Sequence, residues 1–177
     1  MRRRIPLLVI LASVVCLDQA TKAWVKRSID LHEFRPVIDG FLSLSHVQNR
    51  GAAFGILSDA DLPYQSAVFS VVSLLALVAI AVYAMRLPAT ARLPRMALSL
   101  VLGGAIGNLI DRVRLGFVVD FIHVYWKRHQ WPDFNMADSA ISVGVALLLL
   151  DMFMAPQKSV SRGAEVAATA TSAGRTE

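Results

Sequence analysis

Two aspartates in apolar surroundings, Asp120 and Asp138, are the residues of this chain best suited by type and position to chemistry. Asp120 lies within the run Val-Val-Asp-Phe-Ile (118–122), where an unpaired carboxylate is costly to bury. Asp138 stands near the start of an apolar block. Two carboxylates brought face to face share a proton, because like charges a few Å apart cannot both ionise cheaply. Such a pair can take a proton from water and donate one to a carbonyl oxygen, as amide hydrolysis requires.

Asp138 also has a purely structural interpretation. It follows Asn135 by three residues, which is the spacing of a helix N-cap and its N3 residue. An acid at that position also suits the helix dipole. This spacing alone favours a cap, but the presence of Asp120 in the preceding segment shifts the interpretation toward a catalytic pair.

Other polar residues lie within apolar blocks, where a charge costs several kcal/mol unless it is paired or hydrated. Asp18 and Lys22 are four residues apart and share one helix face, either as the lining of a polar cavity or as a structural ion pair. Gly104, Asn108 and Arg112 also recur every four residues. The glycine favours close helix packing, whereas Asn108 and Arg112 suit packing and a polar site equally well.

Several other chemistries are poorly supported. The single cysteine, Cys16, lies in an apolar run and is interpreted as a small hydrophobic residue. The four histidines lack the spacing of a zinc-binding helix, so no metal or other cofactor is expected. The net charge of +5 comes from basic residues clustered at the ends of apolar blocks. That placement favours contact with anionic lipid over binding of nucleic acid.

The apolar residues, which make up 55% of the 177, come in long blocks that predict a helical membrane protein. We expect one four-span domain over residues 1–156, with a disordered tail over 157–177. Each block has roughly the 20 residues needed to cross a hydrocarbon core. The first is interpreted as a retained span, because no small-x-small cleavage site follows it. The predicted spans cover approximately residues 5–25, 65–85, 93–110 and 136–154.

Charge and residue type also predict how the spans are connected. Arginines precede the first span and flank the short connection between the second and third, which favours both termini in the cytoplasm. The two outer connections are longer. Alternation over residues 41–47 predicts one or two short strands, and the segment around Asp120 is expected to be extended.

Five motifs in order resemble those of bacterial lipoprotein signal peptidase, also called signal peptidase II. The resemblance covers about residues 5–154 and shows no departure at the motif positions. The motifs are Asp-Gln-Ala-Thr-Lys (18–22), Asn-Arg-Gly-Ala-Ala-Phe-Gly (49–55), Gly-Gly-Ala-Ile-Gly-Asn-Leu-Ile-Asp-Arg (103–112), Val-Asp-Phe (119–121) and Phe-Asn-Met-Ala-Asp-Ser (134–139).

This resemblance implies an aspartic endopeptidase of the bacterial inner membrane, with its active site near the extracytoplasmic face. It implies four transmembrane helices, a small extracytoplasmic β cradle and an interfacial helix. The substrate would be a prolipoprotein, cleaved on the amino side of a diacylglyceryl cysteine, and globomycin would inhibit the enzyme. The implied catalytic residues are Asp120 and Asp138. The other implied polar site residues are Asp18, Lys22, Asn49, Gly104, Asn108, Arg112, Asn135 and Ala137.

Further hypotheses remain open from the residues alone. Asn49 and Arg112 are candidates to bind substrate carbonyls, Asn108 and Asn135 to orient the two carboxylates, and residues 51–55 to form a flap. We expect a monomer that contacts membrane lipids. The alternative functions are a proton-coupled transporter, with a relay of Asp18, Lys22, Asp111 and Arg112, or a structural membrane subunit. Four spans without an inverted repeat are few for a transporter.

Overall fold

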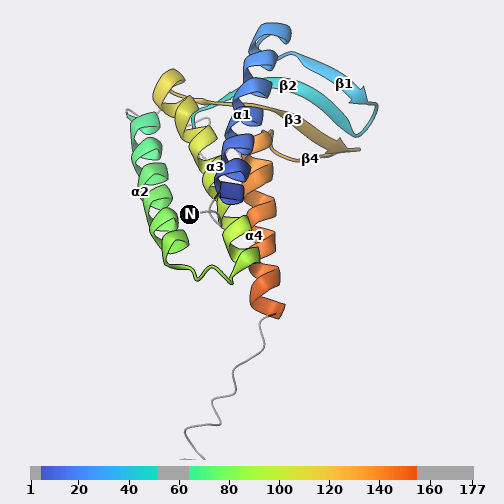
Figure 1. Cartoon of the computed structure of the whole chain (residues 1–177). Coiled ribbons are helices and arrows are strands. Elements are labelled where there is room, and N and C mark those ends of the chain that lie inside the picture. Colours follow the sequence, from blue (N-terminus) through green and yellow to red (C-terminus); the bar gives the residue numbers. More distant parts are fainter. Residues whose placement is uncertain (1–4, 52–63, 155–177) are drawn as a thin grey trace, which may run out of the picture.

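The computed structural model describes residues 5–51 and 64–154, which form four helices and one antiparallel sheet (Figure 1). In chain order the elements are α1 (Ile5–Ser28), β1 (Phe34–Ile38), β2 (Leu42–Asn49), α2 (Gln65–Arg86), α3 (Arg92–Leu115), β3 (Val118–Trp126), β4 (His129–Gln130) and α4 (Met136–Met154). The predicted combination of four apolar helices with a small sheet is therefore confirmed. The tail over residues 157–177 lies outside the described residues.

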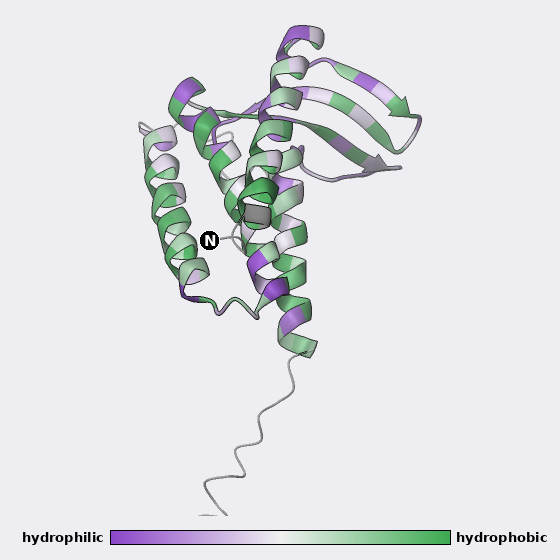
Figure 2. Cartoon of the chain, viewed as in Figure 1, coloured by the Kyte–Doolittle hydropathy of each residue, from purple (hydrophilic) through white to green (hydrophobic). Residues whose placement is uncertain are grey.

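All four helices are long and apolar enough to cross a membrane. The clearest case is α2, whose most apolar stretch has no residue buried inside the protein. Its large apolar side chains, such as Val68 and Leu75, are exposed. Figure 2 shows hydrophobic residues along the helices, and hydrophilic ones at the sheet end and near the connection between α2 and α3. Lipid rather than protein is therefore the natural partner of these helix surfaces.

Helix α3 is the central helix, since it contacts α1, α2 and α4. Glycines make two of these contacts close. A Cβ at Gly103 would lie 2.8 Å from the Cβ of Val14 on α1, and one at Gly104 would collide with the backbone carbonyl oxygen of Ala137 on α4. The glycines thus have the expected packing role, because the absence of a side chain lets α1 and α4 lie close to the backbone of α3.

Helix α3 also continues five residues beyond Ile110, where the apolar block was expected to end. It stops at Gly116, which adopts the left-handed conformation (φ 83°) and donates its N–H to the carbonyl oxygen of Arg112. The hydropathy of the block falls before the helix ends, because the helix carries Asp111 and Arg112 in its last turns. Both residues are thereby fixed on a rigid element.

The sheet has the strand order β1-β2-β3-β4 and lies at one end of the helices (Figure 1). The predicted strand over residues 41–47 corresponds to β2, and the extended segment around Asp120 corresponds to β3. Val25 and Ile29, at the end of α1, pack against Val119 and Phe121 of β3. This small core fixes β3, and with it Asp120, against the helical bundle.

Candidate active site

Asp120 is buried on β3 and held from the neighbouring strand. It is 2% exposed, and its register partner on β2 is Val47. Asn49, two residues further along β2, donates its Nδ2–H to Asp120 Oδ2 at 2.9 Å. The antiparallel pairing of β2 and β3 therefore brings together two residues that are 71 positions apart in the sequence.

Asp138 lies in the first turn of α4, in the capping arrangement that its spacing predicts. Asn135 precedes the helix and accepts the N–H of Asp138 on its Oδ1 at 3.0 Å. In return, Asp138 Oδ2 accepts the backbone N–H of Asn135 at 3.2 Å. The predicted helix cap is thus present, and it leaves Asp138 Oδ1 available for other partners.

Asn135 also connects the two aspartates. Its side chain is fully buried, and its Nδ2 donates to Asp120 Oδ1 at 2.7 Å. The preceding residue, Phe134, exchanges backbone hydrogen bonds with Ile122 of β3, which places the start of α4 beside that strand. One residue therefore holds both carboxylates, that of Asp120 through its side chain and that of Asp138 through its backbone N–H, from a position fixed by backbone pairing.

Asn108 on α3 supports Asp138 from the other side. Its Oδ1 accepts a hydrogen bond from Lys22 Nζ at 2.8 Å, and its Nδ2 donates to Asp138 Oδ1 at 2.8 Å. Because an ammonium group can only donate, Lys22 determines which end of the Asn108 amide faces it. The N–H end consequently points at the carboxylate.

Lys22 is itself buried and has three acceptors for its three N–H groups. Besides Asn108, it contacts Asp18 Oδ2 at 2.9 Å and Asp111 Oδ2 at 3.0 Å. Gln19 donates to Asp111 Oδ1 at 3.0 Å. Asp18 and Lys22 thus form more than the self-contained pair that their spacing alone allows, since Lys22 also joins α1 to Asn108 and Asp111 on α3.

Asp18 also reaches α4. Its Oδ1 accepts the backbone N–H of Ala137 at 3.0 Å, across 119 positions of sequence. Ala137 is fully buried between this contact and Gly104, whose missing side chain leaves room for the Ala137 carbonyl. Asp18, Gly104 and Ala137 therefore position the first turn of α4, which carries Asp138.

Arg112 and Asn49 both hold Gly51, at the end of the first described segment. Arg112 Nη2 donates to the carbonyl oxygen of Gly51 at 2.9 Å, and Asn49 Oδ1 accepts its N–H at 2.9 Å. The two donors expected to bind substrate carbonyls thus have partners within the protein. Arg112 contacts Gly51, and Asn49 contacts both Gly51 and Asp120. The remainder of the expected flap, residues 52–55, lies outside the described residues.

The environment of Asp120 favours its protonated form. Burial, and secondly the charge of Asp138, raises the pKa of Asp120 to about 7, against the opposing hydrogen bonds from Asn49 and Asn135. Asp138 is partly exposed, whereas Asp120 is not. The arrangement can thus supply a proton from Asp120 near neutral pH, together with a carboxylate that water can reach.

All ten predicted site residues are connected through this network, directly or through one shared neighbour. Gln19 and Asp111 belong to it as well, although neither is among the site residues that the family resemblance implies. Asp111 had a signal, since it is ionisable and follows an apolar block, whereas Gln19 had none beyond its motif. The residues that the structure describes include no cluster of three or more His, Cys, Asp or Glu suited to a metal ion.

Four membrane-length helices, three of which (α1, α3 and α4) join β2 and β3 in one hydrogen-bonded network around two aspartates, define a helical membrane protein with a polar site at one end of its bundle. The profile of the family described as signal peptidase (SPase) II matches residues 10–154. The chain belongs to this family, and the resemblance seen in its motifs is confirmed.

Relatives and solved structures agree with this assignment. The lipoprotein signal peptidase of Geobacter sulfurreducens is 54% identical over 144 residues, which cover 81% of this chain and 88% of the relative. The lipoprotein signal peptidase of Geobacter metallireducens is 51% identical over the same shares. A solved structure described as a bacterial membrane enzyme, determined by the in meso method at 1.9 Å resolution, matches with a TM-score of 0.74 and 28% identity. That match covers 85% of this chain and 94% of the solved chain.

Proposed function

We propose that Asp120 and Asp138 are the catalytic pair with which this signal peptidase removes signal peptides from prolipoproteins. The observation that carries the proposal is Asn135, which donates its side-chain Nδ2–H to the carboxylate of Asp120 and its backbone N–H to the carboxylate of Asp138. A purely structural cap needs only Asp138. The additional bond to a second buried acid, whose pKa is about 7, is the arrangement expected of an acid–base pair.

The two aspartates then have distinct roles. Asp138, the more exposed, takes a proton from a water molecule whose oxygen attacks the carbonyl carbon of the scissile amide. Asp120 donates its proton to the carbonyl oxygen, which becomes a hydroxyl in the tetrahedral intermediate. Collapse of the intermediate breaks the C–N bond. The proton taken up by Asp138 passes to the leaving amine, and Asp120 regains its own proton from the hydroxyl.

An apolar groove provides a place for the membrane-embedded part of the substrate. It has a volume of about 270 Å³ and contains side chains from α1, α3 and α4, including Val14, Leu17 and Val143. It also contains Met136 and Ser139, which flank the turn that carries Asp138. We assign this groove to an apolar part of the substrate. Arg112 has further N–H groups beyond the one on Gly51 with which to bind a substrate carbonyl.

The remaining features of the enzyme follow from the same assignment. Cleavage falls on the amino side of a diacylglyceryl cysteine, without a metal or other cofactor, and globomycin inhibits it. The four-span domain over residues 1–156 acts as a monomer in the bacterial inner membrane, and the tail over residues 157–177 lies outside the described residues. Both termini are cytoplasmic, and the sheet forms the extracytoplasmic cradle. The expected interfacial helix does not occur in residues 5–51 or 64–154.

Substitution of each acid tests the catalytic pair. Asp120→Asn and Asp138→Asn should each lower the rate of processing of a diacylglyceryl-modified prolipoprotein by about 10²–10⁴-fold, because each removes an acid–base group. The rate is measured with the full chain reconstituted in vesicles. Asp151→Asn, which alters a carboxyl group near the far end of α4, is the matched control and should process normally.

Normal processing by either of the first two variants, when correctly inserted in the membrane, would refute the pair. A loss of processing with Asp151→Asn of the same size would indicate a general effect of charge rather than catalysis.

A further inference from the structure

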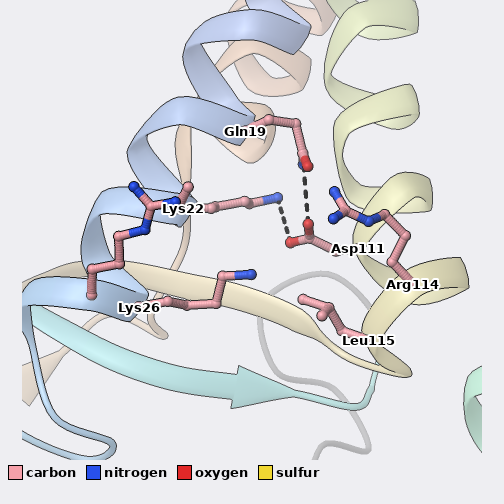
Figure 3. A pocket seen from close by; sticks show the side chains of 8 residues that line it. Gln19, Lys22, Lys26, Asp111, Arg114 and Leu115 are labelled. Carbon is pink, nitrogen blue, oxygen red and sulfur yellow. Dashed lines mark hydrogen bonds and ion pairs between the residues drawn. The ribbon is translucent and has the colours of Figure 1, made fainter.

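A basic hollow lies between the last turns of α1 and α3, next to the network that holds the two aspartates, and its lining shares Gln19, Lys22 and Asp111 with that network. Its volume is about 210 Å³, and its lining includes four basic side chains, Lys22, Lys26, Arg27 and Arg114. Figure 3 shows Lys26 from α1 and Arg114 from α3 extending toward the space between the two helices. Because like charges repel, such convergence on one small space is unfavourable unless an anion compensates it.

The acids of the protein leave most of this positive charge unbalanced. Asp111 is the single acid in the lining, and its oxygens already accept hydrogen bonds from Lys22 and Gln19. Lys22 is further paired with Asp18. Over residues 5–51 and 64–154, Lys26, Arg27 and Arg114 form no ion pair.

The hollow lies at the level where the apolar surface of the spans ends. Trp24, on the same turn as Lys26 and Arg27, is 51% exposed, and Val113, beside Arg114, is 72% exposed. Tryptophan in such a position is typical of the boundary between hydrocarbon and headgroups. Basic side chains of this length extend from a span end to the headgroup layer. An anion that meets them there belongs to the membrane surface.

We propose that this hollow binds the phosphate group of an anionic phospholipid. Its volume is below the roughly 300–1,000 Å³ of sites for drug-sized ligands, so it suits a small charged group better than a large organic molecule. Arginine and lysine side chains are the usual protein ligands of phosphate. The acyl chains of the lipid would remain outside, against the exposed apolar surface that includes Val113.

A simpler account is that these cations only complement the dipoles at the C-termini of α1 and α3. That account explains why basic residues occur in each last turn. It does not explain why the basic residues of both helices line the same hollow. It also predicts no dependence on lipid. In the orientation proposed above, these residues lie on the extracytoplasmic side, where the bias of membrane proteins toward basic residues does not operate.

Thermal unfolding in nanodiscs tests the proposal. The full chain is placed in phosphatidylcholine alone, or in phosphatidylcholine with a minor fraction of phosphatidylglycerol, and lipid retention is followed by native mass spectrometry. Phosphatidylglycerol should raise the unfolding midpoint of the wild-type protein by several degrees. Lys26→Gln with Arg114→Gln should lose most of this shift and bind phosphatidylglycerol at least about tenfold more weakly.

The matched control is Arg86→Gln with Arg92→Gln, which removes two charges near the connection between α2 and α3, far from the hollow. It should keep the full shift. Lys26→Arg with Arg114→Lys retains both charges and should also keep it, which guards against a double variant that merely folds poorly. An equal loss in the control would overturn the proposal, because it would show a general effect of net charge.

Inorganic phosphate added to phosphatidylcholine nanodiscs separates a lipid headgroup from a free anion. Reproduction of the full shift by phosphate alone would overturn the assignment to a lipid. These measurements do not depend on the catalytic assignment. Processing of prolipoprotein in phosphatidylcholine should continue in the Lys26→Gln, Arg114→Gln variant, whatever the outcome for Asp120 and Asp138.

Discussion

At the scale of single residues, Asn135 combines a helix cap with a contact to the proposed catalytic acid, Asp120. As the residue before α4 it caps the helix through Asp138, and its Nδ2 is left free to hold Asp120. The orientation of its amide follows from these bonds, because Oδ1 accepts the N–H of Asp138 and the nitrogen must then face Asp120. A capping box and a carboxylate pair are therefore compatible interpretations of the same residues.

The pKa of Asp120 leads to a prediction about pH. Since the protonated form of Asp120 is the proposed acid, kcat/KM should fall as the pH rises through about 7. The hydrogen bond from Asn49 lowers the pKa of Asp120. Asn49→Ala should accordingly move this alkaline limb upward by about one pH unit, the size expected for loss of a hydrogen bond to a charged group.

The measurement is a pH profile of kcat/KM on a diacylglyceryl-modified substrate. Ser70→Ala, which removes a hydroxyl that donates to the carbonyl oxygen of Ser66 within α2, should leave the profile in place. A limb that stays fixed or moves to lower pH in Asn49→Ala would contradict the assignment of the acid to Asp120.

At the scale of elements, the close approach of α3 and α4 determines where Asp138 lies. The backbone of Ala137 sits directly against Gly104, and its N–H is held by Asp18 of α1. These contacts fix the first turn of α4 from two neighbouring helices. Pairing of Phe134 with Ile122 then aligns that turn with β3.

Gly104→Ala tests this dependence. The added methyl group has no room beside the Ala137 carbonyl, so α4 must shift, at a cost of about 1–3 kcal/mol in stability. Processing should fall by about 10²-fold, because a displacement of about 1 Å at a reacting group has that effect. Both quantities are measured with the purified variant, by thermal unfolding and by the rate of processing.

Gly144→Ala is the matched control in the same interface. Its methyl group would lie 2.7 Å from the carbonyl oxygen of Ala97, deeper in the helix pair and away from Asp138. We expect similar destabilisation with a much smaller loss of processing. Equal losses of processing in both variants would show that the position of the Ala137 turn is not what matters.

At the scale of the whole molecule, the polar groups are divided between the two ends of the bundle. The sheet lies at one end, and the connection between α2 and α3 lies at the other (Figure 1). The two aspartates belong to the sheet end, because Asp120 lies on β3 and Asp138 in the first turn of α4, and the basic hollow lies between the last turns of α1 and α3. Exposed apolar side chains cover the surface between them. This division fits a protein that crosses the membrane and performs its chemistry at one surface.

The proposed orientation can be tested by cysteine labelling. With Cys16 replaced by alanine, His129→Cys in β4 should react with a membrane-impermeant maleimide in intact spheroplasts. Thr90→Cys, in the connection between α2 and α3, should react only after lysis. Both native residues are exposed, so the two sites are comparable in access. The opposite pattern would place the active site on the cytoplasmic side.

The sequence by itself determined the spans, the extended segments and the choice of Asp120 and Asp138. These follow from local composition, because long apolar blocks require lipid and an acid in an apolar run is costly without a partner. It did not determine the end of α3, where the apolar block stops before the helix does.

Only the tertiary structure decided how the polar residues meet. Asp18 contacts Ala137 across 119 positions, and Asn108 contacts Asp138 across 30. Asp111 is the third acceptor for Lys22, and Gln19, which no local pattern marks, holds Asp111 in place. Such contacts depend on which helix faces pack together and on how β3 is paired. The residue pattern within a single element does not specify either, because both are set by elements distant in the sequence.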